Sequence, residues 1–299
     1  MNEPPRDPDA RADVPRLARP LSRRQVLQTS GAALAALGLA GALAAVERTP
    51  TVRAAAPRAT NHRRSDMPAT PNIVLVHGAW ADGSSWGRVI GMLQEDGYPV
   101  FAVPIALASL AGDVQATQQF FASQGITGPT VLVGHSYGGA VISGAAAGLP
   151  DVRALVYVAA FAPDEGESIN ALLQQFPPTP VLEAVRFDQY GLAWLDRAQF
   201  PEVFAQDVDR DQARVLAAVQ RPFGASIFDE PAGRAAWHNL PTWFQISNQD
   251  RVIGAPAETF FARRMGATTI ALDAGHASLV SHPQDIARLI RQAAQAIAR

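Results

Sequence analysis

Residues 132–140 read LVGHSYGGA, in which Ser136 lies between Gly134 and Gly138 directly after an aliphatic run. The pattern Gly-x-Ser-x-Gly between a strand and a helix is typical of a nucleophilic serine on a sharp turn. The small glycines let strand and helix pass closely, and the helix N-terminus favours negative charge developing beside the serine. The pentapeptide also occurs by chance, so an ordinary serine in a glycine-rich turn is the alternative.

The chain on both sides of this turn alternates short aliphatic runs with amphipathic segments. That alternation predicts an α/β fold, a mostly parallel six-stranded sheet with helices on both faces, in a domain over residues 71–299. The expected strands are almost wholly apolar, as strands buried on both faces are, and cover residues 72–76, 100–103, 130–133, 154–160, 242–247 and 268–272. The expected helices cover residues 85–96, 110–123, 137–147, 256–264 and 283–298.

Residues 164–240 interrupt the alternation with several prolines, polar helical stretches and scattered aromatic residues. Because an unstructured loop of this length is unusual, we predict a small helical lid over one edge of the sheet. Such an insertion above strand ends commonly closes a pocket.

A nucleophilic serine needs a base to take its proton. His276 is the preferred candidate, because it follows the last expected strand and lies at the same end of the sheet as Ser136. Other histidines near strand or helix ends are His77, His135 and His282, whereas His62 and His238 have no such placement.

Two aspartates could orient that histidine. Asp250 follows the fifth expected strand and lies 26 residues before His276, which brings both to adjacent strand ends. Asp164 follows the fourth strand and leads into the insertion, where a role in a turn or a pocket wall is the simpler interpretation. We predict Asp250 as the acid, with Asp164 as the alternative.

An acyl-transfer site also needs two backbone N–H groups to bind the oxyanion. Tyr137 follows the serine and supplies the first expected donor, and Ala79, in the loop after the first strand, supplies the second. The neighbouring Gly78 would let the backbone of that loop approach closely.

Composition excludes several kinds of site. The formal net charge is −2 and the later three-quarters of the chain has no long basic run, so nucleic-acid binding is not expected. The chain has neither cysteine nor lysine, which excludes disulfides, thiolate nucleophiles, cysteine-based zinc sites and lysine Schiff bases. We expect no metal or organic cofactor.

The N-terminal segment predicts export. Arg23 and Arg24 precede an apolar stretch at residues 29–46 that is rich in alanine and glycine, which is typical of a twin-arginine signal over residues 1–46. Cleavage near residues 42–44 or 54–56 stays open, and an uncleaved anchor is the alternative. Residues 47–70 are predicted to be a disordered linker. The expected partner is the twin-arginine export machinery, and no stable membrane anchor is expected.

Five motifs together resemble the α/β-hydrolase superfamily over about residues 72–298: VLVHGAWADGSSW (74–86), VGHSYGGAVI (133–142), LVYVAAFAPDEGES (155–168), SNQDRVI (247–253) and AGHASLVSHP (274–283). The lack of two leading strands and the compact insertion are similar to the branch of plant methylesterases, hydroxynitrile lyases and their bacterial esterase relatives. The resemblance implies a triad of Ser136, Asp250 and His276, with Ala79 and Tyr137 as oxyanion donors.

The sequence therefore predicts an exported serine hydrolase, a carboxylesterase that cleaves small, largely apolar esters through an acyl-enzyme. The resembling lyases use a lysine near the catalytic histidine, which this chain lacks, and dehalogenases and epoxide hydrolases of this fold use an aspartate where Ser136 stands. The same triad supports amide, thioester or C–C hydrolysis or acyl transfer. A ligand-binding protein with negligible turnover is the non-enzymatic alternative.

Overall fold

A computed structural model of the chain describes residues 70–298, so the predicted signal and nearly all of the predicted linker lie outside the described residues. Its centre is a six-stranded sheet in the order β2-β1-β3-β4-β8-β9, in which every neighbouring pair is parallel. This arrangement confirms the predicted α/β architecture. The strands are β1 (Asn72–Val76), β2 (Val100–Val103), β3 (Thr130–His135), β4 (Val152–Val158), β8 (Thr242–Ser247) and β9 (Thr268–Leu272).

The central strand β3 is buried along its whole length. It continues two residues beyond the predicted end, because His135 still pairs with Val158 of β4. Strand β4 begins and ends two residues earlier than predicted. The apolar run there is longer than the strand, so pairing with neighbouring strands, rather than hydrophobicity, sets where the strand stops.

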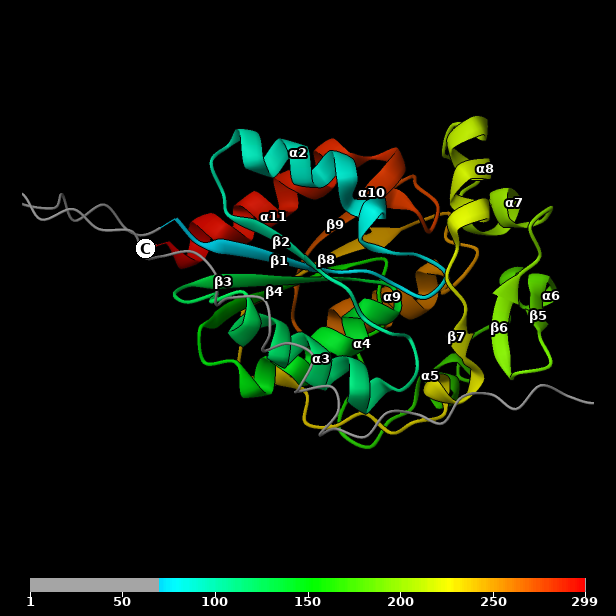
Figure 1. Ribbon diagram of the computed structural model, residues 1–299, viewed down its shortest axis with the longest axis horizontal. Coiled ribbons are helices and arrows are strands. Elements are labelled where there is room, and N and C mark those ends of the chain that lie inside the picture. The colour runs from blue at the N-terminus through cyan, green and yellow to red at the C-terminus, as the bar shows by residue number, and fades with distance from the viewer. Residues whose placement is uncertain (1–69, 299) are drawn as a thin grey trace, which may run out of the picture. The chain divides into compact units, whose positions relative to one another are not determined.

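Helices cover both faces of the sheet, α2 (Gly87–Glu95) and α11 (Pro283–Ile297) on one face and α3 (Leu110–Ser123), α4 (Tyr137–Ala145) and α9 (Ala255–Arg264) on the other (Figure 1). Helix α11 shows why these segments are helical. Its buried Ile286, Leu289, Ile290 and Ala293 recur at the spacing of one helix face. A short helix that the sequence analysis did not predict, α10 (Ser278–Ser281), precedes it.

The insertion stands beyond the carboxyl ends of the strands (Figure 1). It contains the helices α5 (Ile169–Leu173), α6 (Val181–Ala184), α7 (Phe200–Phe204) and α8 (Arg210–Val219). It also contains an antiparallel sheet of β5 (Val185–Phe187), β6 (Leu192–Leu195) and β7 (Phe223–Gly224), which the prediction of a small helical lid did not include. Strands this short carry too few residues to show an alternating pattern in the sequence.

Four short 3-10 helices complete the secondary structure of the described residues: η1 (Gly83–Trp86), η2 (Ala146–Gly148), η3 (Ala225–Phe228) and η4 (Ala236–His238). Within residues 70–298, no helix is both long enough and apolar enough to cross a bilayer.

Candidate active site

Ser136 occupies the turn between β3 and α4 in an unusual backbone conformation. Its φ of 53° and ψ of −123° lie in a region that residues other than glycine rarely adopt. The Ser136 carbonyl accepts the N–H groups of Gly139 at 2.9 Å and Phe161 at 3.1 Å. Hydrogen bonds to two separate segments thus hold the turn, and Ser136 lies at the carboxyl edge of the central strand.

The glycine before this turn is required by close packing. A Cβ atom on Gly134 would lie only 2.5 Å from the carbonyl oxygen of Gly138, closer than real side-chain contacts. Strand and helix can therefore turn this sharply only with glycine at position 134, which is the physical basis of the sequence motif.

The structure brings His276 and Asp250 together. Asp250 follows β8, His276 follows β9, and Nδ1 of His276 lies 2.6 Å from Oδ2 of Asp250. The other Asp250 oxygen, Oδ1, accepts the N–H groups of Val252 at 2.6 Å and Ile253 at 2.8 Å. A carboxylate can only accept here, so the proton is on Nδ1, and Nε2 is left as a base without a partner among the described residues.

The electrostatics of this pair favour an ionised aspartate. Burial opposes ionisation of Asp250. The charge and hydrogen bond of His276, together with a backbone hydrogen bond, nevertheless hold the pKa of Asp250 below its ordinary value. A charged Asp250 stabilises the imidazolium that forms when Nε2 takes up a proton.

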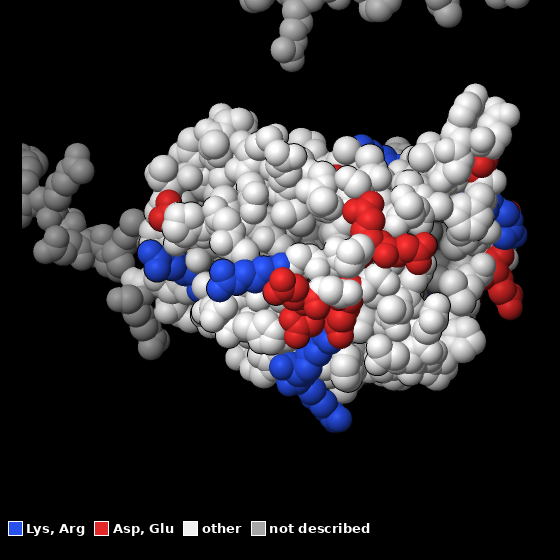
Figure 2. All heavy atoms as spheres, turned by 90° about the horizontal axis from the view of Figure 1, so that it is seen from below, with Lys and Arg blue, Asp and Glu red and all other residues white. Residues whose placement is uncertain are grey.

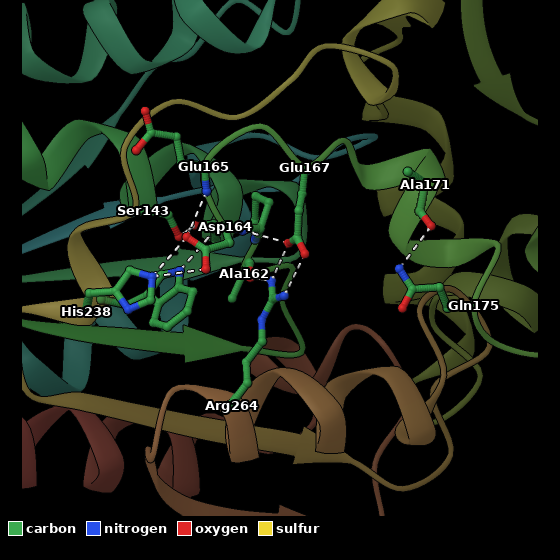
Figure 3. Close-up of polar contacts among 12 residues, drawn as sticks. Ser143, Ala162, Asp164, Glu165, Glu167, Ala171, Gln175, His238 and Arg264 are labelled. Carbon is green, nitrogen blue, oxygen red and sulfur yellow. Dashed lines mark hydrogen bonds and ion pairs between the residues drawn. The ribbon is translucent and has the colours of Figure 1, made fainter.

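Asp164, the alternative acid, takes part in a different network (Figure 3). Its Oδ1 lies 2.9 Å from Nε2 of the half-exposed His238. Beside it, Nη2 of Arg264 lies 2.8 Å from Oε2 of Glu167 (Figure 3). The Glu167–Arg264 ion pair joins the start of the insertion to α9, and the Asp164–His238 contact joins it to η4 near the end of the insertion. The structure therefore places Asp250, and not Asp164, against His276.

The loop after β1 lies against the serine. A Cβ atom on Gly78 would lie 2.7 Å from the Ser136 Cβ, so glycine is needed for this approach. The next residue, Ala79, is buried and lines the same cavity as Ser136. Neither the Ala79 nor the Tyr137 N–H donates to an acceptor in the described part of the chain. Two free donors next to a serine are what an oxyanion-binding site requires.

A cavity of about 180 Å³ opens beside Ser136. Ala79, Trp80 and Phe161 come from the main domain, and none of the described residues that line this cavity is charged. Most of the remaining wall comes from the insertion, including Leu173, Val181, Leu182, Val185, Phe187 and Phe223. The insertion therefore determines the shape of the pocket, as the sequence predicted for a lid above strand ends.

Trp80 connects this loop to the lid. It has a positive φ of 56°, and its Nε1 donates to the carbonyl of Ala193 in β6 at 3.2 Å. Its ring packs edge-on against Phe204 and Phe223 of the insertion. Movement of the lid would therefore disturb the loop that carries Ala79.

His135 forms a hydrogen bond with the backbone of the loop that carries His276. Its Nε2 lies 3.0 Å from the His276 carbonyl oxygen, which can only accept, so His135 is the donor. Burial and then the nearby His276 lower the pKa of His135 to about 3, so its imidazole is neutral. From the sequence, His135 was expected only to lie near the end of a strand or helix.

Two carboxyl groups near the site were missed in the sequence. Asp113 in α3 accepts the Tyr137 hydroxyl at 2.9 Å and so fixes the start of α4. Glu258 in α9 is fully buried beside Asp250. Both lie on helices at positions that read as ordinary polar residues, and the sequence carries no signal for their partners.

Among residues 70–298, no group of three or more histidine, aspartate or glutamate side chains is arranged to hold a metal ion. Charged side chains of both signs lie beside one another on the face that Figure 2 shows. This face has the mixed charge of an ordinary protein surface rather than a basic patch.

A family model described as the alpha/beta hydrolase family matches residues 73–289. The chain belongs to the alpha/beta hydrolase family. This alpha/beta hydrolase is 30% identical to a carbendazim hydrolyzing esterase of Nocardioides sp. (strain SG-4G) over 184 residues, which cover 56% of this chain and 66% of that protein. It is 29% identical to methylesterase 8 of Arabidopsis thaliana over 128 residues, 39% of this chain and 47% of that one. The predicted likeness to methylesterases and bacterial esterases is thus confirmed.

Among solved structures, this alpha/beta hydrolase resembles a pyrethroid hydrolase from Sphingobium faniae JZ-2. The TM-score is 0.62 and the identity 24%, over 76% of this chain and 98% of that one. At this identity the likeness shows the shared fold. The family match and the esterase relative establish the chain as a hydrolase-type enzyme.

Proposed function

We propose that this alpha/beta hydrolase is an exported serine carboxylesterase acting on small, neutral, largely apolar esters. The observation that carries the proposal is the position of Ser136. It stands on a strained turn in an apolar cavity, beside two N–H groups that have no acceptor among residues 70–298. The carboxyl ends of neighbouring strands carry the buried His276–Asp250 pair.

In the proposed mechanism, Ser136 Oγ attacks the ester carbonyl while His276 Nε2 takes up the hydroxyl proton. The N–H groups of Ala79 and Tyr137 bind the oxyanion of the tetrahedral intermediate. His276 then gives its proton to the leaving alcohol, and an acyl group remains on Ser136. Water, deprotonated by His276, releases the acid in a second round of the same steps.

The cavity supports this substrate class. A volume of about 180 Å³ suits a small acyl or alcohol group, and the apolar wall favours groups that leave water readily. Because the lining lacks charged side chains, a charged substrate would lose its hydration without gaining a partner. The naming of the Nocardioides relative as an esterase also supports ester hydrolysis.

Export is the second part of the proposal. It rests on Arg23 and Arg24 before the weakly hydrophobic stretch 29–46, all outside the described residues. A chain without cysteine is compatible with an oxidising compartment, because no thiol can mispair there.

A fluorophosphonate probe tests the nucleophile directly, because only an activated serine reacts rapidly. We expect mass spectrometry to find the probe on Ser136, and Ser136→Ala to lose both labelling and at least about 10³-fold in kcat while keeping its thermal stability. A series of p-nitrophenyl esters of increasing acyl length should show a preference for short neutral chains. Labelling elsewhere, or full turnover by purified Ser136→Ala, would contradict the proposal.

A further inference from the structure

A second buried carboxyl group lies beside the His276–Asp250 pair. Glu258, in the first turn of α9, has no exposed surface. Its Oε2 accepts the Ser247 N–H at 2.8 Å, but no N–H or O–H in the described part of the chain reaches its Oε1. A buried carboxylate oxygen without a donor is strongly destabilising, so this atom requires a physical explanation.

The explanation lies in its neighbour. Besides burial, the causes that raise the pKa of the Glu258 carboxyl include its interaction with the neighbouring Asp250 carboxyl, which is close enough for a hydrogen bond once one of the two groups is protonated. Two ionised carboxylates are both acceptors and repel each other, so this contact is a hydrogen bond only if one of them carries a proton.

The hydrogen bonds decide which group carries it. Asp250 accepts three donors, the N–H groups of Val252 and Ile253 and the Nδ1–H of His276. Glu258 accepts one. Donors stabilise the charged form, so the anion resides on Asp250. Burial and then the Asp250 charge raise the pKa of Glu258 well above its ordinary value, and they outweigh the preference of a first helical turn for an anion.

We infer that Glu258 is protonated at neutral pH and donates its hydroxyl to Asp250, so that a carboxylic acid positions the acid of the triad. The inference rests on the proposed function for its catalytic meaning. Glu258 touches no reacting atom and is a positioning residue. The groups facing it are the Asp250 carboxylate and the Ser247 N–H, with His276 and then His135 beyond Asp250. Its hydrogen bond holds the Asp250 carboxyl group in one orientation. Because this bond partly neutralises the charge of Asp250, it also weakens the electrostatic attraction between Asp250 and the His276 imidazolium.

Protonation can be measured without catalysis. In protein labelled with ¹³C at glutamate side-chain carboxyls, infrared spectroscopy at neutral pH should show the C=O stretch of one protonated, water-free carboxylic acid. That band should be absent in Glu258→Gln and present in Ser136→Ala. Its absence from the wild-type protein would overturn the inference even if Ser136 reacts with fluorophosphonate. Its presence in a protein that fluorophosphonate does not label would support the protonated acid and reject only the esterase.

Two variants test the positioning role. Glu258→Gln keeps an acceptor for Ser247 and an N–H donor for Asp250, so kcat/KM should stay within about threefold of wild type with an unchanged pH profile. Glu258→Met has similar volume but no donor, so kcat/KM should fall by about 10- to 100-fold. The acidic limb of the kcat/KM–pH profile of Glu258→Met should move to higher pH. Without the Glu258 hydroxyl as donor, the full charge of Asp250 stabilises the His276 imidazolium more strongly.

Glu230→Gln is the matched control, since Glu230 also accepts a backbone N–H, that of Leu110 at 2.8 Å, but makes no hydrogen bond to Asp250, His276 or Ser136 among the described residues. Its profile should match wild type. A folded Glu258→Met with a wild-type acidic limb would contradict the positioning role. If Glu258→Met does not fold, the infrared band and Glu258→Gln decide the matter, and a Glu258→Gln with the displaced acidic limb would overturn it.

Discussion

Nδ1 of His276 lies 2.6 Å from Oδ2 of Asp250, although 26 positions separate the two residues in the chain. Neither side chain has any exposed surface. Adjacent parallel strands, β8 and β9, bring their carboxyl ends together and so create this contact. Because both side chains are shielded from bulk solvent, competition from solvent weakens the hydrogen bond little, and Asp250 can fix the tautomer of His276.

The first prediction concerns this contact. Asp250→Asn removes the charge and can offer the wrong hydrogen-bond partner to Nδ1, so kcat should fall by about 10²–10⁴-fold. Asp164→Asn is the control, because Asp164 pairs with His238 instead, and its kcat should change little. Both are measured on one ester. A large loss in Asp164→Asn beside a normal Asp250→Asn would show that the proposed acid is wrong.

Gly78 gives a second prediction. An alanine there would place its Cβ 2.7 Å from the Ser136 Cβ, and relief of that clash must move the loop that carries Ala79. Gly78→Ala should therefore reduce kcat by about 10²–10³-fold, the usual cost of losing an oxyanion donor. Gly87→Ala meets no atom within 4 Å and serves as control. Equal activity in the two variants would contradict the assignment of the Ala79 N–H as an oxyanion donor.

His135 predicts a specific loss of stability in acid. Its pKa falls from an ordinary 6.5 to about 3 in the folded protein, so between these values only the unfolded chain binds the proton. The stabilising contribution is complete above the unfolded value and is lost as pH falls towards 3. His135→Gln lacks this titration, so its free energy of unfolding should fall less steeply, by up to about 1.4 kcal/mol per pH unit.

Urea unfolding from neutral pH down to the acid range measures this difference. Above about pH 7, position 135 is uncharged in both the folded and the unfolded state. The free energies of unfolding of wild type and His135→Gln should therefore differ there by a constant amount. Parallel curves throughout the acid range would show that His135 is not held neutral by the fold.

The export proposal predicts that Arg23→Lys with Arg24→Lys leaves the enzyme in the cytoplasm, because the twin-arginine pathway reads arginine itself rather than positive charge. The chain offers a matched control in a second arginine pair, Arg63 and Arg64, which follows the apolar stretch. Lysine at both of those positions should leave export unchanged. Esterase activity and immunoblots of cell fractions give the distribution, and unchanged export of the first variant would reject the signal.

Much of the fold could be predicted because its signals are local. Strands buried on both faces must be apolar, and all six central strands were identified within two residues of their observed ends. The turn at Ser136 needs Gly134 for a close approach that no other residue permits, so its position is also recorded in the sequence. The two- to four-residue strands β5, β6 and β7 leave no such periodic record, so the prediction of a helical lid did not include its small sheet.

The sequence by itself determined where a serine, a histidine and an acid could meet, because chain order along parallel strands decides which residues reach the carboxyl edge. It left Asp164 and Asp250 both open, since each follows a strand. Only the tertiary structure decided which of them faces His276, and only it placed Glu258 against that acid. The physical reason is that hydrogen bonds and desolvation act between side chains that packing brings together, and neither effect leaves a pattern along the chain.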